Sequence, residues 1–355
     1  MKMNKKIIII VALLILTVLF GITYFKNRNN QKNLNKIQSV LTEKVYFPSM
    51  NEDGTILYFY STEKKPGLYK TELSNLNNQQ LSEALGNIEE ITWSPDKQNI
   101  IIKIKYDDSF NQSGSFYQNA QGFEDVDTYW LFDIKTQKAI QIGKYTLGAN
   151  FDYSGKRIIY YEYDYQDTID QLKICDLQLE KCSDGEAMKY PLGLTILSLN
   201  ENEMILYANS TEADIDSLFK LNINSGSVEE IQKDLLISSA ITSLRGSKII
   251  YSSSKSEGKA QYTSVLDISK KSNKTFDRFF NPIDCVISSN EEFAFCFKQN
   301  QKKNDLYKVT LKNGKSSLFV SINNNEEYLP ENLYLSSDGQ TLYYTFNDFL
   351  KKISL

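Results

Sequence analysis

A short unit of two strand-like segments around a tight turn recurs along the chain. In its clearest copy, residues 91–104, a half-apolar segment ends at Ser94, a turn follows at Pro95 and Asp96, and an apolar segment begins at Ile100. Proline fixes its own φ and aspartate bonds to nearby backbone, so the turn has a local physical cause. With Ser94 as the marker, the equivalent positions fall at Ser49, Asp152, Ser198, Ser243, Ser288 and Ser336.

The spacing of these markers predicts the architecture. They lie about 45 residues apart, with one longer interval after Ser94, and about 40 to 45 residues is the length of one four-stranded propeller blade. The segments after the turns, such as 158–161 and 342–346, are apolar at nearly every residue, as expected for strands covered by sheets on both faces. We therefore predict an all-β propeller. A two-sheet sandwich with similar turns does not explain the constant period.

The two ends of the chain predict how the ring closes. After Ser336 the chain stops one strand short of a complete repeat, whereas a strand-like segment at 37–45 precedes the first repeat. Pairing of this segment with the last blade gives seven blades and removes two sheet edges. Six blades result if one weak repeat is displaced.

Two of these motifs carry a resemblance to a known family. Ile91-Thr-Trp-Ser-Pro-Asp96 and Tyr334-Leu-Ser-Ser-Asp-Gly-Gln-Thr-Leu342 resemble the TolB-like, WD-repeat-related propellers, and the resemblance covers roughly residues 37–355. It implies the fold and leaves the function open. The chain departs from true WD repeats because it has no histidine, and hence no Gly-His signature, and only two tryptophans, Trp93 and Trp130.

The N-terminal segment predicts a membrane anchor. Residues 7–25 carry no charge and follow Lys2, Lys5 and Lys6, and about 20 apolar residues are needed to cross a bilayer as a helix. No small-residue cleavage site follows, which favours an uncleaved signal anchor. We predict a cytoplasmic tail at 1–6, a single transmembrane span at 7–25, a polar stalk at 26–36 and the propeller at 37–355.

The four cysteines indicate the side of the membrane. Cys175 and Cys182 are placed symmetrically about one predicted turn, and Cys285 and Cys296 about another, so each pair can face each other across a hairpin. Two such pairs suit disulfides in an oxidising compartment, and we expect the propeller on the extracytoplasmic side. The alternative is four buried thiols in a cytosolic protein.

One face of the predicted ring carries an acidic sector. The long insertion 107–128 joins the second and third strands of blade 2, and the corresponding connections of the next two blades are also acidic and emerge on the same face. The candidate partner-binding residues are Asp107, Asp108, Phe116, Tyr117, Phe123, Glu124, Asp125, Asp127, Glu162, Asp164, Asp167, Asp170, Glu212, Asp214 and Asp216. Basic residues occupy the corresponding loops of blades 1, 5 and 6, namely Lys64, Lys65, Lys255, Lys259, Lys298, Lys302 and Lys303.

This charge arrangement predicts a docking surface for a partner protein with a basic patch. We expect a protein-binding or scaffolding module at the cell envelope, whose partner the sequence does not name. The formal charge of −4 gives no general attraction to nucleic acid, so no nucleic-acid partner is expected.

The absence of histidine bears on catalysis. It excludes a Ser-His-Asp triad, a Cys-His pair and any histidine-ligated metal in this sequence, so we predict no enzyme, no catalytic or metal-binding residue and no cofactor. The alternative is a glycan-binding or carbohydrate-hydrolysing propeller with its site in the central channel. No pair of acidic residues is evident on the predicted channel-lining strands.

Overall fold

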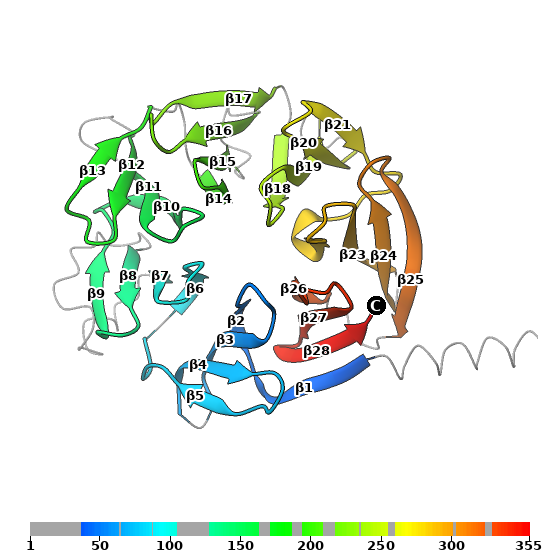
Figure 1. Cartoon of the computed structure of the whole chain (residues 1–355), viewed down its shortest axis with the longest axis horizontal. Helices are drawn as coiled ribbons and strands as arrows, with labels where there is room; N and C mark the ends of the chain where they lie inside the picture. The colour runs from blue at the N-terminus through cyan, green and yellow to red at the C-terminus, as the bar shows by residue number, and fades with distance from the viewer. Residues whose placement is uncertain are drawn as a thin grey trace, which may run out of the picture.

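The computed structural model describes residues 37–63, 65–86, 88–104, 128–162, 171–186, 194–208, 217–233, 236–254, 260–300, 303–323 and 329–355. Within these ranges, the chain forms seven four-stranded antiparallel sheets arranged as a ring (Figure 1). The prediction of an all-β propeller with seven blades is confirmed, and the alternative of six blades is excluded.

Each blade is a meander whose first strand is innermost (Figure 1). Blade 1 contains β2 (Tyr46–Met50), β3 (Ile56–Ser61), β4 (Gly67–Glu72) and β5 (Asn78–Gln80). Blade 2 contains β6 (Ile88–Trp93), β7 (Asn99–Ile104), β8 (Thr128–Asp133) and β9 (Lys138–Gln141). Blade 3 contains β10 (Thr146–Phe151), β11 (Arg157–Glu162), β12 (Gln171–Asp176) and β13 (Cys182–Asp184). Blade 4 contains β14 (Leu194–Asn200), β15 (Glu203–Ala208), β16 (Leu218–Asn222) and β17 (Val228–Gln232).

The remaining three blades complete the ring. Blade 5 contains β18 (Leu236–Thr242), β19 (Lys248–Ser254), β20 (Tyr262–Asp267) and β21 (Ser272–Thr275). A short 3-10 helix, η2 (Pro282–Asp284), leads into blade 6, which contains β22 (Cys285–Ile287), β23 (Phe293–Asn300), β24 (Lys303–Thr310) and β25 (Lys315–Asn323). Blade 7 contains β26 (Glu331–Leu335), β27 (Thr341–Phe346), β28 (Phe349–Ser354) and, as its outer strand, β1 (Ile37–Lys44).

The two ends of the described chain pair with each other in blade 7 (Figure 1). β1 runs antiparallel to β28, with Ile37 opposite Ile353 and Lys44 opposite Phe349. Lys44 also forms an exposed 3.0 Å ion pair with Asp348, which contributes little to stability because water screens it. Strand pairing and the burial of Leu41 therefore hold the closure together.

The core lies between neighbouring blades because each second strand is covered on both faces. In β7, five of the six residues are buried, and in β11 the run from Ile158 to Tyr161 is buried. One apolar cluster contains Tyr161 of blade 3 and Leu206 of blade 4, so the contact between two sheets forms one continuous core. The continuous apolar runs in the sequence are thus explained by burial against two neighbours.

In six blades, the turn between the first and second strands is closed by one polar residue. Ser94 Oγ accepts a 3.0 Å hydrogen bond from the backbone N–H of Asn99, and Asp152 Oδ1 accepts one of 3.2 Å from Arg157. In blade 1 the equivalent residue is Asn51, whose Oδ1 accepts from Ile56 at 2.8 Å. The predicted marker Ser49 is therefore wrong by two residues. In blade 4 the predicted marker Ser198 has no such role, because the hairpin there is tighter, with Asn200 opposite Glu203.

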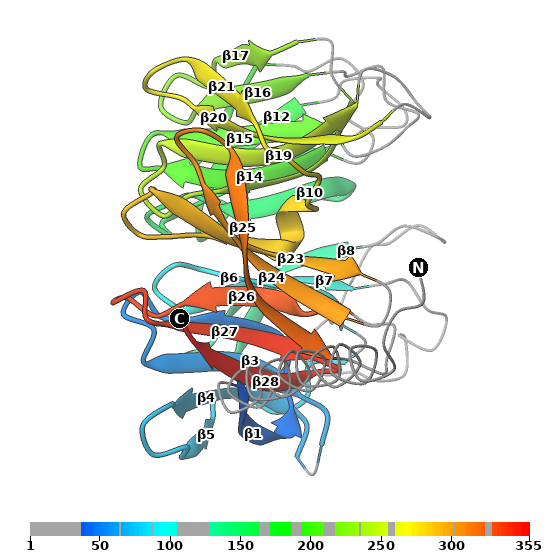
Figure 2. The same cartoon turned by 90° about the vertical axis from the view of Figure 1, so that its right-hand side faces the viewer.

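The ring has two different faces, which Figure 2 shows edge-on. The turn face carries the turns between first and second strands and includes the C-terminus, at the left of Figure 2. On the opposite side, which we call the loop face, the first strands begin and the second strands end, as at Ile88 and Ile104. The predicted tail, span and stalk at residues 1–36 lie outside the described residues. Within the described ranges, no helix is both long and apolar enough to span a membrane.

Candidate functional site

Most of the predicted acidic sector lies outside the described residues. Of its residues, only Glu162, at the loop-face end of β11, belongs to the described chain. Its Oε1 accepts a 3.1 Å hydrogen bond from the backbone N–H of Lys144, so this carboxylate holds the connection that leads into β10. Of the predicted basic residues, Lys65, Lys298 and Lys303 are described, and Lys65 and Lys303 are exposed.

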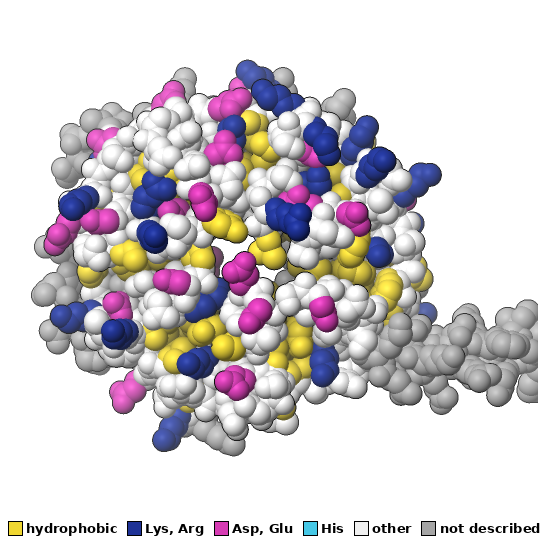
Figure 3. Space-filling model, viewed as in Figure 1, with side chains coloured by type: hydrophobic (Ala, Val, Ile, Leu, Met, Phe, Trp, Pro, Cys, Tyr) yellow, Lys and Arg dark blue, Asp and Glu magenta, His cyan; other side chains and the backbone are white. Residues whose placement is uncertain are grey.

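The inner strands line an opening at the centre of the ring (Figures 1 and 3). Side chains connect these strands from blade to blade. Asn150 Nδ2 donates to the carbonyl oxygen of Ile196 at 2.7 Å, and Thr242 Oγ1 donates to that of Ser198 at 2.8 Å. On the turn face, charged side chains of both signs surround the opening in Figure 3. Hydrophobic side chains also border the opening in Figure 3, and the two hydrogen bonds link the inner strands of blades 3, 4 and 5.

Near the loop-face ends of the inner strands, two carboxyl groups have raised pKa values. Burial raises the pKa of Asp284 to about 6, and the nearby charge of Glu331 adds to the rise. Asp284 is the last residue of η2 and only 6% exposed, and no described residue forms a hydrogen bond to its side chain. Glu331, the first residue of β26, is exposed. The two acidic residues therefore meet where blades 6 and 7 begin.

A second such carboxyl lies on β6. Burial raises the pKa of Glu90 although its side chain is exposed to water on one side; Lys103 opposes the rise and Glu89 adds to it. Lys103 Nζ forms its 3.1 Å ion pair with Glu89, and the described chain supplies no hydrogen bond to the Glu90 carboxyl. Among the described acidic residues whose pKa is shifted, Glu90 and Asp284 alone shift upward.

Glu90, Asp284 and Glu331 define a site that we call the channel mouth. In Figure 1, β6 and the short yellow coil of η2 lie on opposite sides of the central opening, and all three residues lie near the loop-face ends of inner strands. Ile283, beside Asp284 in η2, is 59% exposed and adds an apolar surface. This site was not predicted from the sequence, because Asp284 and Glu331 are distant in sequence and Glu90 lies on another blade, across the opening.

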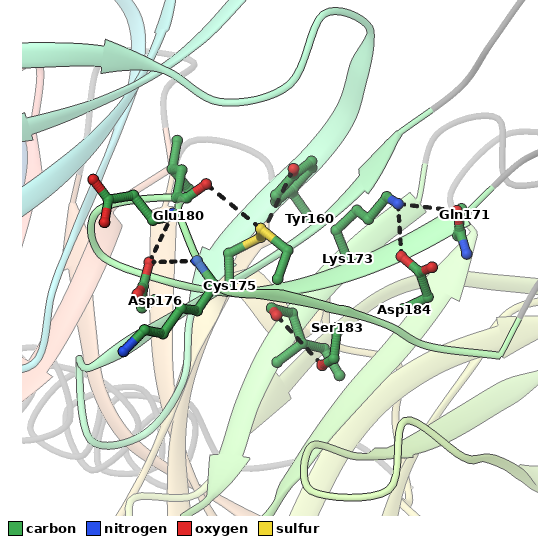
Figure 4. Close-up of a disulfide and its surroundings, with 12 residues drawn as sticks. Tyr160, Gln171, Lys173, Cys175, Asp176, Glu180, Ser183 and Asp184 are labelled. Carbon is green, nitrogen blue, oxygen red and sulfur yellow. Dashed lines mark hydrogen bonds and ion pairs between the residues drawn. A yellow bond between two sulfur atoms is a disulfide. The ribbon is translucent and has the colours of Figure 1, made fainter.

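Both predicted disulfides are present. Cys175–Cys182 joins β12 to β13, and Cys285–Cys296 joins β22 to β23, each between residues directly opposite in the ladder. Figure 4 shows the first bridge, with the Tyr160 hydroxyl directed at Cys175 Sγ, 3.8 Å away. Further along the same two strands, Lys173 Nζ lies 2.6 Å from an Asp184 carboxylate oxygen. The bridges thus reinforce individual blades and do not link one blade to another.

Within the described ranges, no group of three or more acidic or cysteine side chains is arranged to hold a metal ion.

Comparisons with known proteins define the class of fold. A solved oligogalacturonate lyase in complex with manganese superposes with a TM-score of 0.61 at 11% sequence identity, covering 90% of this chain and 93% of its own. An oligogalacturonate lyase from Vibrio parahaemolyticus gives 0.63 at 10% identity with the same coverage. Kuenenia stuttgartiensis hydrazine synthase gives 0.55 at 10% identity, covering 89% of this chain and 97% of its own.

At these identities the likeness shows the seven-bladed propeller fold alone. No protein-family model matches the chain, and no curated protein matches it. The resemblance to TolB-like and WD-repeat-related propellers is therefore supported only as far as the propeller fold. The prediction that the chain is not an enzyme was drawn from the absence of histidine. It is wrong, because solved structures with this fold include lyases.

Proposed function

We propose that this propeller binds a carbohydrate chain at the channel mouth. The observation that carries the proposal is the pair of carboxyls, Asp284 and Glu90, whose pKa values are raised and which lack a described hydrogen-bond partner. Titratable groups with shifted pKa values in a concave position are typical of binding and catalytic sites. A carboxyl group left without an internal partner is also costly, and a ligand hydroxyl can satisfy it.

The chemistry of the channel mouth favours an uncharged or amino sugar. Carboxylate oxygens accept hydrogen bonds from sugar hydroxyls or an ammonium group, a neutral Asp284 can also donate one, and Ile283 offers an apolar surface to the face of a sugar ring. The solved lyases are named for oligogalacturonate, an acidic sugar chain. Acidic sugars would be repelled by Glu331 and Glu90, so the proposed ligand differs in charge from theirs.

The pairing of Asp284 with Glu331 also suits cleavage of such a ligand. Glycoside hydrolysis uses two carboxyl groups, one as the acid and the other as the base or nucleophile. Asp284, with its pKa raised to about 6, would protonate the leaving oxygen, and the Glu331 carboxylate would act on the other side of the scissile bond.

A binding experiment tests this proposal. Calorimetry of the full-length protein with neutral cello-oligosaccharides, with glucosamine oligomers and with oligogalacturonate should show binding to one of the first two classes, and an assay of reducing ends should show whether it is cleaved. Asp284→Asn and Glu90→Gln should each weaken binding by about tenfold, equal to 1.4 kcal/mol. Glu201→Gln, an exposed acid in a turn-face turn, is the control. Binding of oligogalacturonate alone, or equal binding by all variants, would contradict the proposal.

Protein docking on the loop face is a second candidate. It is favoured by the acidic connections of blades 2 to 4 in the sequence and by the exposed Lys65 and Lys303 on other blades. Changing Asp107, Asp108, Glu124, Asp125 and Asp127 to the amides should then abolish capture of an envelope protein by the intact chain. Unchanged capture would remove this candidate and leave sugar binding unaffected.

We also propose that the propeller lies outside the cytoplasm. The two disulfides favour an oxidising compartment, and the uncharged run at 7–25 is long enough for an anchor. Protease protection of the propeller in right-side-out and inverted vesicles distinguishes the two sides: degradation in intact right-side-out vesicles is the expected result, and degradation only in inverted vesicles contradicts it.

A further inference from the structure

A lysine in the turn of blade 2 reaches a serine of blade 1. Lys97 has φ +60, in the left-handed region that favours glycine, and glycine occupies the corresponding position in four other blades, at Gly54, Gly155, Gly246 and Gly339. From this backbone position, Lys97 Nζ lies 2.7 Å from Oγ of Ser49. Lysine is unfavourable in this backbone conformation, yet the Lys97 side chain extends from blade 2 to blade 1 on the turn face.

The amine of Lys97 is in an unusual environment. Burial lowers its pKa to about 8, and the nearby Asp96 carboxylate only partly opposes this effect. In the described chain, Ser49 is the one hydrogen-bond partner of Nζ, and no carboxylate lies within ion-pair distance. With this pKa, about a tenth of the amine is uncharged at pH 7 and about half at pH 8, and the uncharged form can accept a proton.

Ser49 is held in place by the blades on either side of it. The strand β2 is irregular between Tyr46 and Ser49, and Phe47 has φ +50. Trp93 Nε1 of blade 2 donates to the Phe47 carbonyl oxygen at 2.8 Å, while the Tyr334 hydroxyl of blade 7 donates to that of Pro48. Ser49 itself is only partly buried, and Lys97 is its one described side-chain partner.

We propose that Ser49 and Lys97 form a nucleophile–base pair that accepts acyl groups from small esters at the turn-face opening. A serine activated by a neighbouring lysine needs a hydrogen bond between the two and an uncharged amine. Ser49 lies on the inner strand β2, and Lys97 lies in the turn that follows the inner strand β6, on the face of the ring that Figure 3 shows. This proposal is independent of sugar binding, because the channel mouth lies on the opposite face.

The reaction balances without a cofactor. Lys97 Nζ takes the hydroxyl proton of Ser49, and Oγ forms a bond to the ester carbonyl carbon. The bond from that carbon to the alkoxy oxygen then breaks, and the alcohol leaves with the proton returned by Lys97. Water attacks the acyl-serine in the same way, releases the carboxylic acid and restores Ser49.

The pH dependence follows from the charges around Lys97. Asp96 lies in its own turn, while the turn of blade 1 carries Glu52 and Asp53 and that of blade 3 carries Lys156. Of these groups, Asp96 acts on the pKa of Lys97, and it raises that pKa. The rate of acylation should therefore rise through about pH 8, where Lys97 loses its proton.

Blade 6 provides a matched control within the same molecule. Glu291, with φ +55, occupies the equivalent turn position, and its Oε1 accepts a hydrogen bond from Ser243 Oγ, at 2.5 Å, in blade 5. The other carboxylate oxygen, Oε2, accepts a hydrogen bond from Ser247 Oγ. The side-chain partner of Ser243 is thus a carboxylate from the same kind of turn, in place of an amine. Ser243 should therefore not be acylated.

Acylation of the full-length protein tests the proposal. With p-nitrophenyl acetate and with a fluorophosphonate probe, intact mass and peptide mapping should show one adduct, on Ser49. Ser49→Ala should abolish it, Lys97→Met should slow its formation by about 100-fold, and Ser243→Ala should leave it unchanged.

Lys97→Arg retains a positive side chain that cannot act as a base, so it should also lose the reaction while keeping the melting temperature within a few degrees of the parent. Failure to modify Ser49 in the folded protein, or equal rates for the parent and Lys97→Arg, would overturn the proposal. An adduct on Lys97 that persists in Ser49→Ala would overturn it too, because the amine would then be the nucleophile.

Discussion

Asn150 of β10 donates a hydrogen bond from Nδ2 to the carbonyl oxygen of Ile196 in β14, 2.7 Å away in the next blade. Its Oδ1 also accepts from the backbone N–H of Phe151. Asn150→Ala leaves the carbonyl group of Ile196 without this partner, which should lower the free energy of unfolding by about 1 to 3 kcal/mol. Urea denaturation measures the change. Asn75→Ala, at an exposed turn, should stay within about 0.5 kcal/mol of the parent; a similar loss there would contradict the special role of the link between blades.

Deleting residues 1–44 should open the ring. The deletion removes β1, leaves the outer edge of β28 unpaired and uncovers the apolar surface beneath Leu41. An open, unpaired edge favours association between molecules, so size-exclusion chromatography should show aggregates and urea should unfold the variant at lower concentration. Deleting residues 1–36 alone keeps β1 and is the control. A monomeric, equally stable deletion of 1–44 would show that pairing of the ends does not hold the ring closed.

Each disulfide should stabilise the blade that it crosses without being required for the fold. The sequence separations are short, 7 for Cys175–Cys182 and 11 for Cys285–Cys296. Loop closure of this length is worth about 2 to 3 kcal/mol in the chain-entropy model. Replacing Cys175 and Cys182 together with alanine should lower the free energy of unfolding by that amount.

The control for the disulfide experiment is chemical reduction. A reductant should destabilise the parent by about the sum of both bridges, and the variant without Cys175 and Cys182 only by the contribution of the other bridge. Circular dichroism should remain that of a β protein throughout. Loss of the folded spectrum on reduction would mean that the propeller depends on its bridges.

Asp284 should make the protein less stable as pH rises from about 4 to 6. Its pKa is raised to about 6 in the folded chain, so in this window the unfolded chain is ionised at Asp284 while the folded chain still holds the proton. The stability that protonated Asp284 contributes is fully present below its pKa in the unfolded chain and is lost above its pKa in the folded chain. The loss should be on the order of 2 to 3 kcal/mol.

Asp284→Asn should remove this part of the pH dependence. The difference in the free energy of unfolding between variant and parent, measured in urea at pH 4 and again at pH 7, should shift in favour of the variant at the higher pH. Glu201→Gln, in an exposed turn, should show no such shift. A constant difference for Asp284→Asn would mean that Asp284 titrates normally in the folded protein.

The repeat was predictable because each blade depends on local causes. A tight turn closed by a short polar side chain is followed by a strand covered on both faces. This order leaves a recognisable pattern of polar and apolar residues even where the blades share no identical motif. The cysteine pairs were predictable for the same reason, since a hairpin places residues symmetric about its turn opposite each other. The marker was misplaced at Ser49 because asparagine closes the turn as well as serine does, as Asn51 shows, and at Ser198 because the hairpin of blade 4 is tighter.

The candidate sites were not predictable because neither follows from local sequence. Asp284 and Glu331 belong to different blades, and their proximity depends on how η2 packs between inner strands. Lys97 was part of the clearest repeat, yet its contact with Ser49 requires a non-glycine residue in the left-handed position of that turn. One signal was present: lysine and glutamate replace glycine at that position in blades 2 and 6.

The pairing of β1 with β28 also has a consequence for how the protein is made. β1 leaves the ribosome ahead of all the other described strands, and its partner β28 is the last of them, so β1 must wait unpaired until β28 has been made. The other six blades can form in order behind it, since each is contiguous in sequence. Closing a loop of this length is slow, and we expect the joining of the two ends to be the final event of folding.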